Sequence, residues 1–512
     1  MADGDAHAGD VPEPVVTKAL TFLLAAILGT IAAVHYHHLG LTLSHYDARG
    51  HLIVARRIFD SITPGWQQIG AFWLPVPHLL NAIPVQIDAF YRTGASAVAI
   101  SVASFAIATA SIAWIVLLLT ESAAGAFAAS AVFALNPNLV YLQATPMTEP
   151  LLLGLTILGV GLLISWSSKD ETTRPRLVGW VLALACLTRY EAWPVTYAAL
   201  AGAFWVRWRR GDSLTAALRR VLGVAIYPTA ALLAFAVFSR VVVGKWFVST
   251  DFFVPENKAL GLPMVAIDEI IWGARELSGH VVIVLAVAGC LTLLIAGLFV
   301  RRHASALIAL SLGATAAVPW AAFVDGHPFR IRYMVPLIAI EAVAVGVLIY
   351  FVGLLVGRAA LRTVLAVAVI GIAVYELHPL DDHAPMVLEA QWDRVNFEPR
   401  RAVTSCLKAR YHGESVMASM GSLGHYMQET SRDGFNLRNF LHEGNGDIWL
   451  AALNTPRVYA GWLLIEEKAE GGDMLAKRAR EYPEFLQGYS RICEGAGLAL
   501  YERQNRTLNV NR

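Results

Sequence analysis

The chain has 512 residues, of which 56% are hydrophobic and only 15% are charged. Soluble domains carry about 25% charged residues, so this composition predicts a chain that sits in lipid. The formal net charge of +1 gives none of the basic character that nucleic-acid binding requires, so no nucleic-acid partner is expected.

The first residues, 1–16, are polar and acidic and lack the basic segment of a signal peptide, which predicts a disordered cytoplasmic tail. A helix needs about 20 apolar residues to cross a bilayer. Suitable apolar runs lie at 17–38, 95–119, 123–142, 149–167, 221–243, 280–300, 304–323, 333–356 and 363–377.

The stretch 177–206 is too long for one span, and arginines and lysines flank it on both sides. The positive-inside rule places both flanks in the cytoplasm, so the stretch predicts a hairpin of two short helices that turns near Arg189. The chain is therefore expected to be a polytopic α-helical membrane protein with about eleven transmembrane helices.

The same rule places three larger segments outside the cytoplasm. They are the first loop, 40–94, a second loop, 244–279, and everything after the transmembrane domain 17–377, namely 378–512. Because the cytoplasmic loops are short, the chemistry is expected to face outward from the inner (plasma) membrane.

The first loop contains Asp47 and His51 ahead of apolar residues at helical spacing, which predicts an amphipathic helix in the membrane interface. The segment 73–91 predicts a second interfacial helix. Two such helices would roof a cavity, with Asp47 at its edge. Two interpretations of Asp47 stay open: a cap for a helix that starts near Ala48, or a functional acid.

Charged residues also lie beside the later spans. Glu149 opens the fourth span, where an acid complements the helix dipole. Arg189 and Glu191 lie between two apolar helices, and a charge there costs about 2.5–3.5 kcal/mol unless it pairs or lines a cavity. Positions i and i+2 do not face each other on a regular helix, so a local ion pair between them is not expected.

The sequence DGHPFRIRYMVPL carries Arg330 and Arg332 into the tenth span, with His327 and Tyr333 beside them. The planar fork of an arginine matches phosphate oxygens. Arginines at a membrane interface also extend their charged ends to the surface without any ligand, and both interpretations stay open.

Residues 378–512 contain no long apolar run and instead show segments in which apolar and polar residues alternate. ESVMASMG, GWLLIEE, GYSRIC and GLALYERQ predict strands, and 423–429 and 473–481 predict helices. A small α/β domain is expected, with a βαβ unit closed by a hairpin at Glu494-Gly495. Cys406 and Cys493 are able to pair there in an oxidising compartment.

Several of these features together resemble the GT-C superfamily of multi-span glycosyltransferases. They are Asp47 at the end of the first span, the amphipathic first loop, Glu149 at the fourth span and the pair Arg332-Tyr333. HYDARGHLIVARRI is similar to the bacterial mannosyltransferase-like members, and aminoarabinose transferases belong to the same group. The resemblance covers roughly residues 17–377.

The resemblance implies an inverting transferase that takes a sugar from a polyprenyl-phosphate donor. It maps the catalytic acid onto Asp47, the second acid onto Glu149 and the phosphate-binding cations onto Arg330, Arg332 and Arg189. Many relatives carry paired acids in the first loop, whereas Ala48 follows Asp47 here. That departure puts a divalent cation (Mg or Mn) held by Asp47 and Glu149 in doubt.

His51, Glu191, His327 and Tyr333 complete the candidate cavity residues. The acceptor is not named by any motif and is a glycan, a lipid or a protein. A transporter or lipid flippase is the alternative, because intramembrane charges also line transport paths. A non-catalytic scaffold that presents the C-terminal domain is a third reading.

Overall fold

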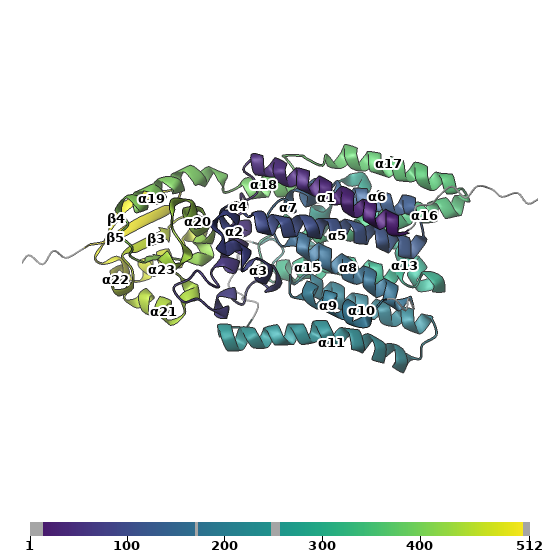
Figure 1. The fold of residues 1–512 in the computed structure, drawn as a ribbon, viewed down its shortest axis with the longest axis horizontal. Helices are drawn as coiled ribbons and strands as arrows, with labels where there is room; N and C mark the ends of the chain where they lie inside the picture. The colour runs from purple at the N-terminus through teal and green to yellow at the C-terminus, as the bar shows by residue number, and fades with distance from the viewer. Residues whose placement is uncertain (1–13, 169–172, 247–256, 505–512) are drawn as a thin grey trace, which may run out of the picture. The chain divides into compact units, whose positions relative to one another are not determined.

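The computed structural model describes residues 14–168, 173–246 and 257–504, so the expected tail 1–16 lies outside the described residues except for Pro14–Val16. The chain divides into two compact units (Figure 1). Unit 1 comprises Met1–Leu39, Val98–Phe238 and Trp246–Leu388, and unit 2 comprises Gly40–Ala97, Ser239–Lys245 and Glu389–Arg512. Unit 2 thus joins the first loop to the C-terminal domain.

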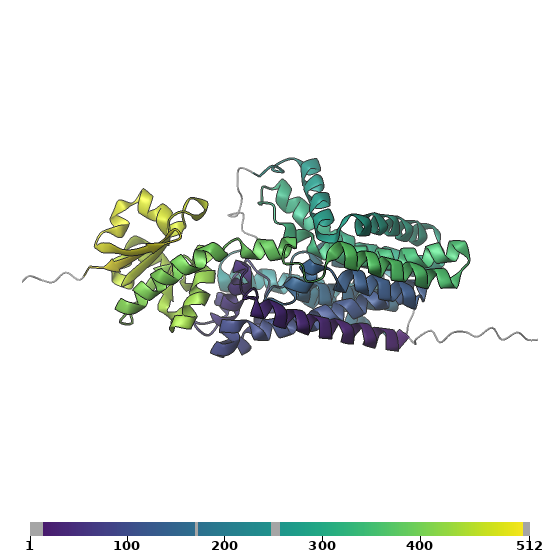
Figure 2. The same cartoon turned by 90° about the horizontal axis from the view of Figure 1, so that it is seen from above.

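Unit 1 is a bundle of apolar helices that run side by side (Figures 1 and 2). In the described part of the chain, eight helices are long and apolar enough to cross a membrane. They are α1 (Pro14–His38), α5 (Ala95–Thr120), α8 (Glu149–Ser167), α11 (Leu214–Phe238), α13 (His280–Phe299), the segment Ala306–Val324 with α14 (Ala306–Leu310) and α15 (Ala317–Val324), the segment Ile331–Val356 with α16 (Ile338–Val356), and α17 (Ala359–Leu377).

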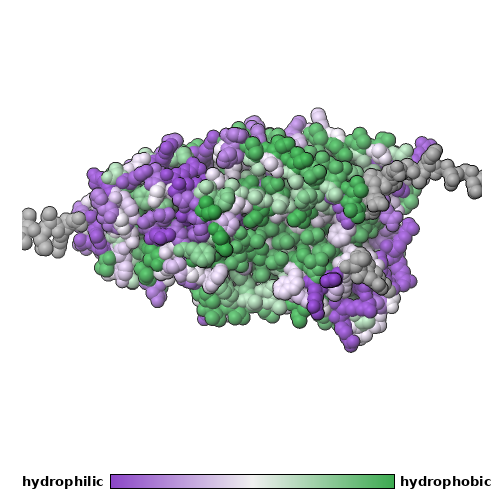
Figure 3. Space-filling view, viewed as in Figure 1, coloured by the Kyte–Doolittle hydropathy of each residue, from purple (hydrophilic) through white to green (hydrophobic). Residues whose placement is uncertain are grey.

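The remaining apolar runs also form helices, but shorter ones. They are α6 (Ala123–Ala134) followed by α7 (Pro137–Leu142), and the hairpin α9 (Pro175–Cys186) and α10 (Ala192–Arg209). The polytopic helical class is confirmed, and so is the hairpin that turns near Arg189. On the face of unit 1 that Figure 3 shows, hydrophobic side chains cover much of the surface of the helical bundle, as contact with lipid tails requires.

Small residues set the helix spacing inside unit 1. A Cβ atom on Gly125 of α6 would lie 2.5 Å from the backbone oxygen of Gly346 on α16, and one on Gly154 of α8 would lie 2.8 Å from that of Ser104 on α5. Lipid tails are as apolar as leucine, so such close packing, rather than the hydrophobic effect, holds membrane helices together.

A break at Asn136-Pro137 separates α6 from α7, so the apolar run 123–142 forms two helices and not one. Asn136 caps α7, and the amides of Asn136 and Asn138 both donate to the backbone oxygen of Leu277. Leu277 belongs to α12 (Pro263–Ser278), the helix that the second loop contains. The two asparagines thereby satisfy a carbonyl at a helix end that membrane burial would otherwise make costly.

The C-terminal domain of unit 2 contains a sheet of strand order β2-β1-β3-β5-β4. The strands are β1 (Val416–Ala418), β2 (Phe440–Leu441), β3 (Trp462–Glu466), β4 (Tyr489–Gly495) and β5 (Leu498–Arg503). β1 pairs in parallel with β2 and β3, whereas β5 pairs antiparallel with β3 and β4. The four predicted strands and the closing hairpin are confirmed; its turn is Ala496-Gly497, both with positive φ.

Helices cover this sheet. They are α19 (Phe397–Arg410), α20 (Met420–Thr430), α21 (Asp447–Asn454) and α23 (Met474–Glu481). α20 and α23 confirm the two helices predicted at 423–429 and 473–481. β2 was not predicted, because two residues are too few to show alternation.

The first loop begins with α2 (Tyr46–Arg56), which confirms the amphipathic helix. The second predicted interfacial helix is wrong in its continuity, since the segment forms α3 (Val76–Asn81), a 3-10 turn at Pro84–Gln86 and α4 (Asp88–Thr93). Pro77 lies in the first turn of α3 and Pro84 opens the 3-10 turn. Proline has no N–H to donate, so it starts a helical turn and does not continue one.

The buried carboxylate of Asp60 fastens the first loop to the C-terminal domain. It accepts hydrogen bonds from Nε of Arg56 at 2.9 Å, from Nε of Arg438 at 3.0 Å and from the backbone N–H groups of Leu437 and Arg438. Apolar residues add to this contact, since Leu52 and Ile53 of α2 share one core with the C-terminal domain. The two segments fold as one body within unit 2.

The structure joins Cys406 and Cys493 by a disulfide, with Cα atoms 6.7 Å apart across a separation of 87 residues. Peptide mapping of the non-reduced protein is expected to find this one linked pair and free thiols at Cys186 and Cys290. Closing a loop of that length is worth about 4–5 kcal/mol in the chain-entropy model, so Cys406→Ser should lower the Tm. Cys290→Ser is the control, and equal Tm values for the two variants would contradict the prediction.

A second prediction concerns Asp60. Burial raises the pKa of its carboxyl, but the hydrogen bonds from Arg56 and Arg438 outweigh burial and hold the pKa below its usual value. Asp60→Asn is expected to cost about 2–3 kcal/mol, because it loses the charge-assisted hydrogen bonds from Arg56 and Arg438, while Asp88 still pairs with Arg56.

The lowered pKa of Asp60 in the folded protein determines how stability depends on pH. The stabilisation by Asp60 is complete above the unfolded pKa of about 4 and is lost as the pH falls through the lower folded value. Thermal unfolding from pH 7 to pH 3 should bring wild type and Asp60→Asn together only in acid. Asp433→Asn, which breaks an exposed pair with Lys408, is the control and should cost about 0–1 kcal/mol.

Candidate active site

In unit 1, Glu149 and Arg189 form a buried ion pair at the start of α8. Glu149 is fully buried, and its Oε1 lies 3.0 Å from Nη1 of Arg189. Nη2 of the same arginine lies 2.6 Å from Glu191, and Nη1 also donates to the hydroxyl of Thr148. One guanidinium therefore serves two carboxylates and a hydroxyl.

The expectation that Arg189 and Glu191 would not pair is wrong. The two residues do not lie in a regular helix, because α9 ends at Cys186 and α10 begins only at Ala192. In the turn between them the two side chains point the same way, and Nε of Arg189 reaches both carboxylate oxygens of Glu191. The turn is not exposed, since Glu191 is buried.

Arg332 lies close enough to Arg189 to interact with it electrostatically. It is buried in the 3-10 segment Ile331–Leu337, with its guanidinium 5.5 Å from the ring centre of Tyr333. Tyr333 in turn lies 3.4 Å from Nε2 of His327. The structure thus brings Glu149, Arg189, Glu191 and Arg332 into one cluster, with Tyr333 and His327 next to Arg332.

His327 faces the same group of arginines. Burial lowers the pKa of its imidazole, and the charges of Arg330 and Arg332 lower it further. A neutral His327 is therefore expected at neutral pH, able to donate or accept a hydrogen bond. Arg330 is half-buried at the residue that precedes the 3-10 segment.

In unit 2, Asp47 lies in the first turn of α2 but does not cap it. The interpretation of Asp47 as the N-cap is wrong: the helix begins at Tyr46, and His45 accepts the N–H of Asp47 through its Nδ1. Nε2 of His45 therefore carries its proton and faces Glu389 at 3.4 Å. Asp47 is half-buried, and its carboxylate lies at the positive end of the helix.

A polar network surrounds this turn. Arg49 pairs with Glu429 on α20, and Arg400 pairs with Asp393. His425 of α20 lies 3.5 Å from Asp393. Burial, with the charge of Arg400 next, keeps the pKa of His425 below its usual value, while the negative charge of Asp47 opposes this shift. No local pattern in the sequence indicates this network, because its members lie far apart in the chain.

His51 lies one helical turn after Asp47 and contacts a second histidine. Its Nδ1 is 3.1 Å from Nε2 of His78, and its ring packs 4.1 Å from Trp73, centre to centre. The sequence signal for His78 is a single polar residue inside the apolar run WLPVPHLL. A Cβ on Gly50 would lie 2.8 Å from the ring of Trp73, so glycine admits the indole against α2.

These residues do not suit a metal ion. No group of three or more His, Cys, Asp or Glu side chains that could hold one occurs within residues 14–168, 173–246 and 257–504. Glu149 already has its charge met by Arg189, which would have to move before a cation could bind. We derive no step through a divalent cation.

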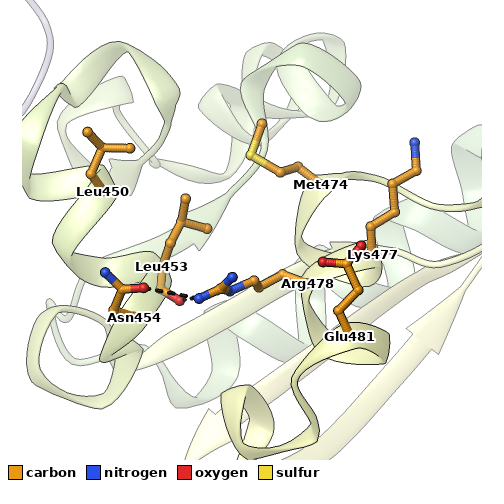
Figure 4. Close-up of a pocket in the computed structure, with 7 residues that line it drawn as sticks. All are labelled: Leu450, Leu453, Asn454, Met474, Lys477, Arg478 and Glu481. Atoms are coloured by element: carbon orange, nitrogen blue, oxygen red, sulfur yellow. Dashed lines mark hydrogen bonds between the residues drawn. The ribbon is translucent and has the colours of Figure 1, made fainter.

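A groove of about 560 Å³ lies between α21 and α23 in the C-terminal domain. Leucines and Met474 form its apolar part, with Lys477 and Glu481 at the other side (Figure 4). Arg478 closes one end, where it donates to Asn454 and to the backbone oxygen of Leu453. None of the residues predicted as site residues lines this groove.

Of three comparisons with known proteins, the one with solved structures finds matches. No protein-family model matches the chain, and no curated protein matches it. ArnT from Cupriavidus metallidurans in the apo state matches with a TM-score of 0.59 and 12% identity, over 94% of this chain and 97% of that one. The same ArnT bound to undecaprenyl phosphate matches with a TM-score of 0.58, 12% identity and the same coverage.

This chain has the GT-C fold. The match covers most of both chains, so the GT-C fold here includes membrane helices and sheet domain alike. An oligosaccharyltransferase from Archaeoglobus fulgidus, in complex with zinc and sulfate, is more distant. Its TM-score is 0.48 at 11% identity, over 96% of this chain and 74% of that one.

The cluster around Arg189 yields a stability prediction. Arg189→Ala leaves the fully buried Glu149 without its cation and is expected to cost about 3–5 kcal/mol. Adding Glu149→Gln should recover part of that loss, because it removes the stranded charge. The measurement is thermal unfolding of the detergent-solubilised protein.

Arg220→Ala is the matched control, since Arg220 makes an exposed pair with Asp212 that is worth about 0–1 kcal/mol. An Arg189→Ala protein as stable as Arg220→Ala would show that the buried pair is not what holds α8 to the hairpin.

Proposed function

We propose that the protein is an inverting glycosyltransferase that moves a sugar from a polyprenyl-phosphate donor to an acceptor hydroxyl on the extracytoplasmic face of the membrane. The observation that carries the proposal is the match of almost the whole chain to ArnT, one of whose structures holds undecaprenyl phosphate.

Asp47 is the proposed general base. Inversion requires a base on the side of the sugar opposite to the leaving group, to take the proton of the attacking hydroxyl. The first turn of α2 favours the ionised carboxylate that this role demands. Half-burial leaves Asp47 within reach of an acceptor, whereas Asp60 is buried in hydrogen bonds to the C-terminal domain.

Arg332 and Arg330 are the proposed ligands of the donor phosphate. Polyprenyl phosphate leaves as an anion, so it needs cations and no general acid. All three nitrogens of Arg189 bond to Thr148, Glu149 or Glu191, which suits Arg189 to holding these side chains in place. Arg189 instead fixes Glu149 and Glu191, and Glu149 is proposed to help orient the substrates.

The disulfide supports the proposed side of the membrane. Cys406 and Cys493 are linked in the C-terminal domain, and disulfides persist in oxidising compartments outside the cytoplasm. Nucleotide sugars are cytoplasmic, so a site on the other face needs a sugar delivered on a lipid. The acceptor is proposed to be a hydroxyl of an envelope glycan, lipid or protein.

The change Asp47→Asn tests the base. Because His45 caps α2, asparagine at 47 keeps the helix and loses only about 0.3–1 kcal/mol of dipole interaction. Turnover of a panel of undecaprenyl-phosphate sugars should fall by about 10²–10⁴, while binding of undecaprenyl phosphate itself is unchanged. Undiminished turnover in a folded Asp47→Asn protein would remove Asp47 from catalysis.

The change Arg332→Ala tests the phosphate site by native mass spectrometry with undecaprenyl phosphate. We expect weaker binding, with partial recovery in Arg332→Lys, which keeps the charge but loses the fork. Arg220→Ala serves again as the control. Unchanged binding in both Arg332→Ala and Arg330→Ala would contradict the phosphate assignment, and binding of the lipid by no form of the protein would contradict the donor class.

A further inference from the structure

Two histidines and a backbone carbonyl form a chain of hydrogen bonds that begins one helical turn from Asp47. Nδ1 of His78 lies 3.0 Å from the carbonyl oxygen of Leu74, and Nε2 of His78 lies 3.1 Å from Nδ1 of His51. Both imidazoles are buried, with 1% of His78 and 7% of His51 exposed.

The positions of the protons follow from this geometry. A carbonyl oxygen only accepts, so Nδ1 of His78 carries a proton and donates it to Leu74. Burial, with the charge of Arg57 next, lowers the pKa of His78 to about 3, so the ring is neutral and its Nε2 must accept. The donor to that nitrogen is then Nδ1–H of His51.

His51 is thus held as a base of defined tautomer. With its proton on Nδ1, the neutral ring has its lone pair on Nε2, and it keeps the bond to His78 whether or not Nε2 takes up a proton. A base oriented by a second group in this way is the arrangement of hydrolase triads, with neutral His78 in the place of the orienting carboxylate. The tilted contact of the His51 ring with the Trp73 ring, 4.1 Å between centres, restricts the orientation of the imidazole further.

His51 lies on the same face of α2 as Asp47, one helical turn further along. Residues i and i+4 of a helix lie on one face, with Cβ atoms about 5–6 Å apart, and Asp47 and His51 are so related on α2. An ordinary imidazole is a stronger base than an ordinary carboxylate by about two pKa units, and the hydrogen bond from Nδ1–H of His51 to His78 persists when Nε2 is protonated, which favours proton transfer from aspartic acid to this histidine.

We propose that His51 is a positioning residue that receives, on Nε2, the proton that Asp47 takes from the acceptor, and that His78 fixes its tautomer. This inference rests on the proposed function. The acceptor oxygen forms its bond to the anomeric carbon as the bond from that carbon to the phosphate oxygen breaks, with its electron pair on the phosphate. The proton goes from the acceptor hydroxyl to Asp47, then to His51 and finally to water.

His51→Asn tests the relay, because the Asn amide N–H replaces Nδ1–H toward His78 but nothing replaces Nε2. In turnover of the undecaprenyl-phosphate sugar panel, kcat should fall by about 10–100-fold, less than for loss of the base, and KM should stay within about twofold. His78→Gln keeps an acceptor for His51 and should retain most of the activity. His383→Asn, at a largely exposed histidine, is the matched control.

Imidazole in the buffer separates proton transfer from packing. It should restore turnover to His51→Ala, whose cavity admits it, and should leave wild type unchanged. No restoration in a folded His51→Ala protein would overturn the proposal, as would full kcat in His51→Asn. If either result came with an inactive Asp47→Asn protein, the proposed function would stand; an active Asp47→Asn protein would overturn the base and the relay together.

Discussion

The carboxylate of Asp60 holds together the part of the molecule in which Asp47 lies. It is buried, and it accepts hydrogen bonds from Arg56 at the end of α2, from two backbone N–H groups and from the guanidinium of Arg438. Removing one partner of such a buried network costs several charge-assisted hydrogen bonds at once, so the first loop and the C-terminal domain are stable mainly together. The position of α2 therefore depends on a domain encoded more than 300 residues later.

Unit 1 also pairs its buried charges, and its partners Glu149, Arg189 and Glu191 lie closer together in the sequence. Arg189, in the hairpin turn, pairs with Glu149 and Glu191. Arg332 lies near Arg189, so the cluster holds two positive and two negative side chains. Charges within a bilayer are tolerated when they are paired or face a polar cavity. An arginine whose nitrogens are all engaged is suited to positioning carboxylates, which is the role proposed for Arg189.

Most helices and strands could be predicted from the spacing of apolar residues, but few of the contacts between side chains could be. Apolar runs predicted the helices of unit 1, and alternation predicted four strands. The turn that lets Arg189 reach Glu191 was missed, because the spacing rule holds only for a continuous helix. The contact of Asp60 with Leu437 was invisible, since no local pattern reports a partner far along the chain.

The histidines beside Asp47 also make electrostatic sense. A carboxylate at position 51 or 78 would add a negative charge near Asp47 and favour its protonated form, which is unable to act as the proposed base. His78, held neutral by burial, orients His51 without adding charge. The pair also offers no second carboxylate for a cation to bridge, in keeping with Ala48 where relatives carry a second acid. For the proposed reaction, one acid and two imidazoles on α2 and α3 would supply the groups that move a single proton.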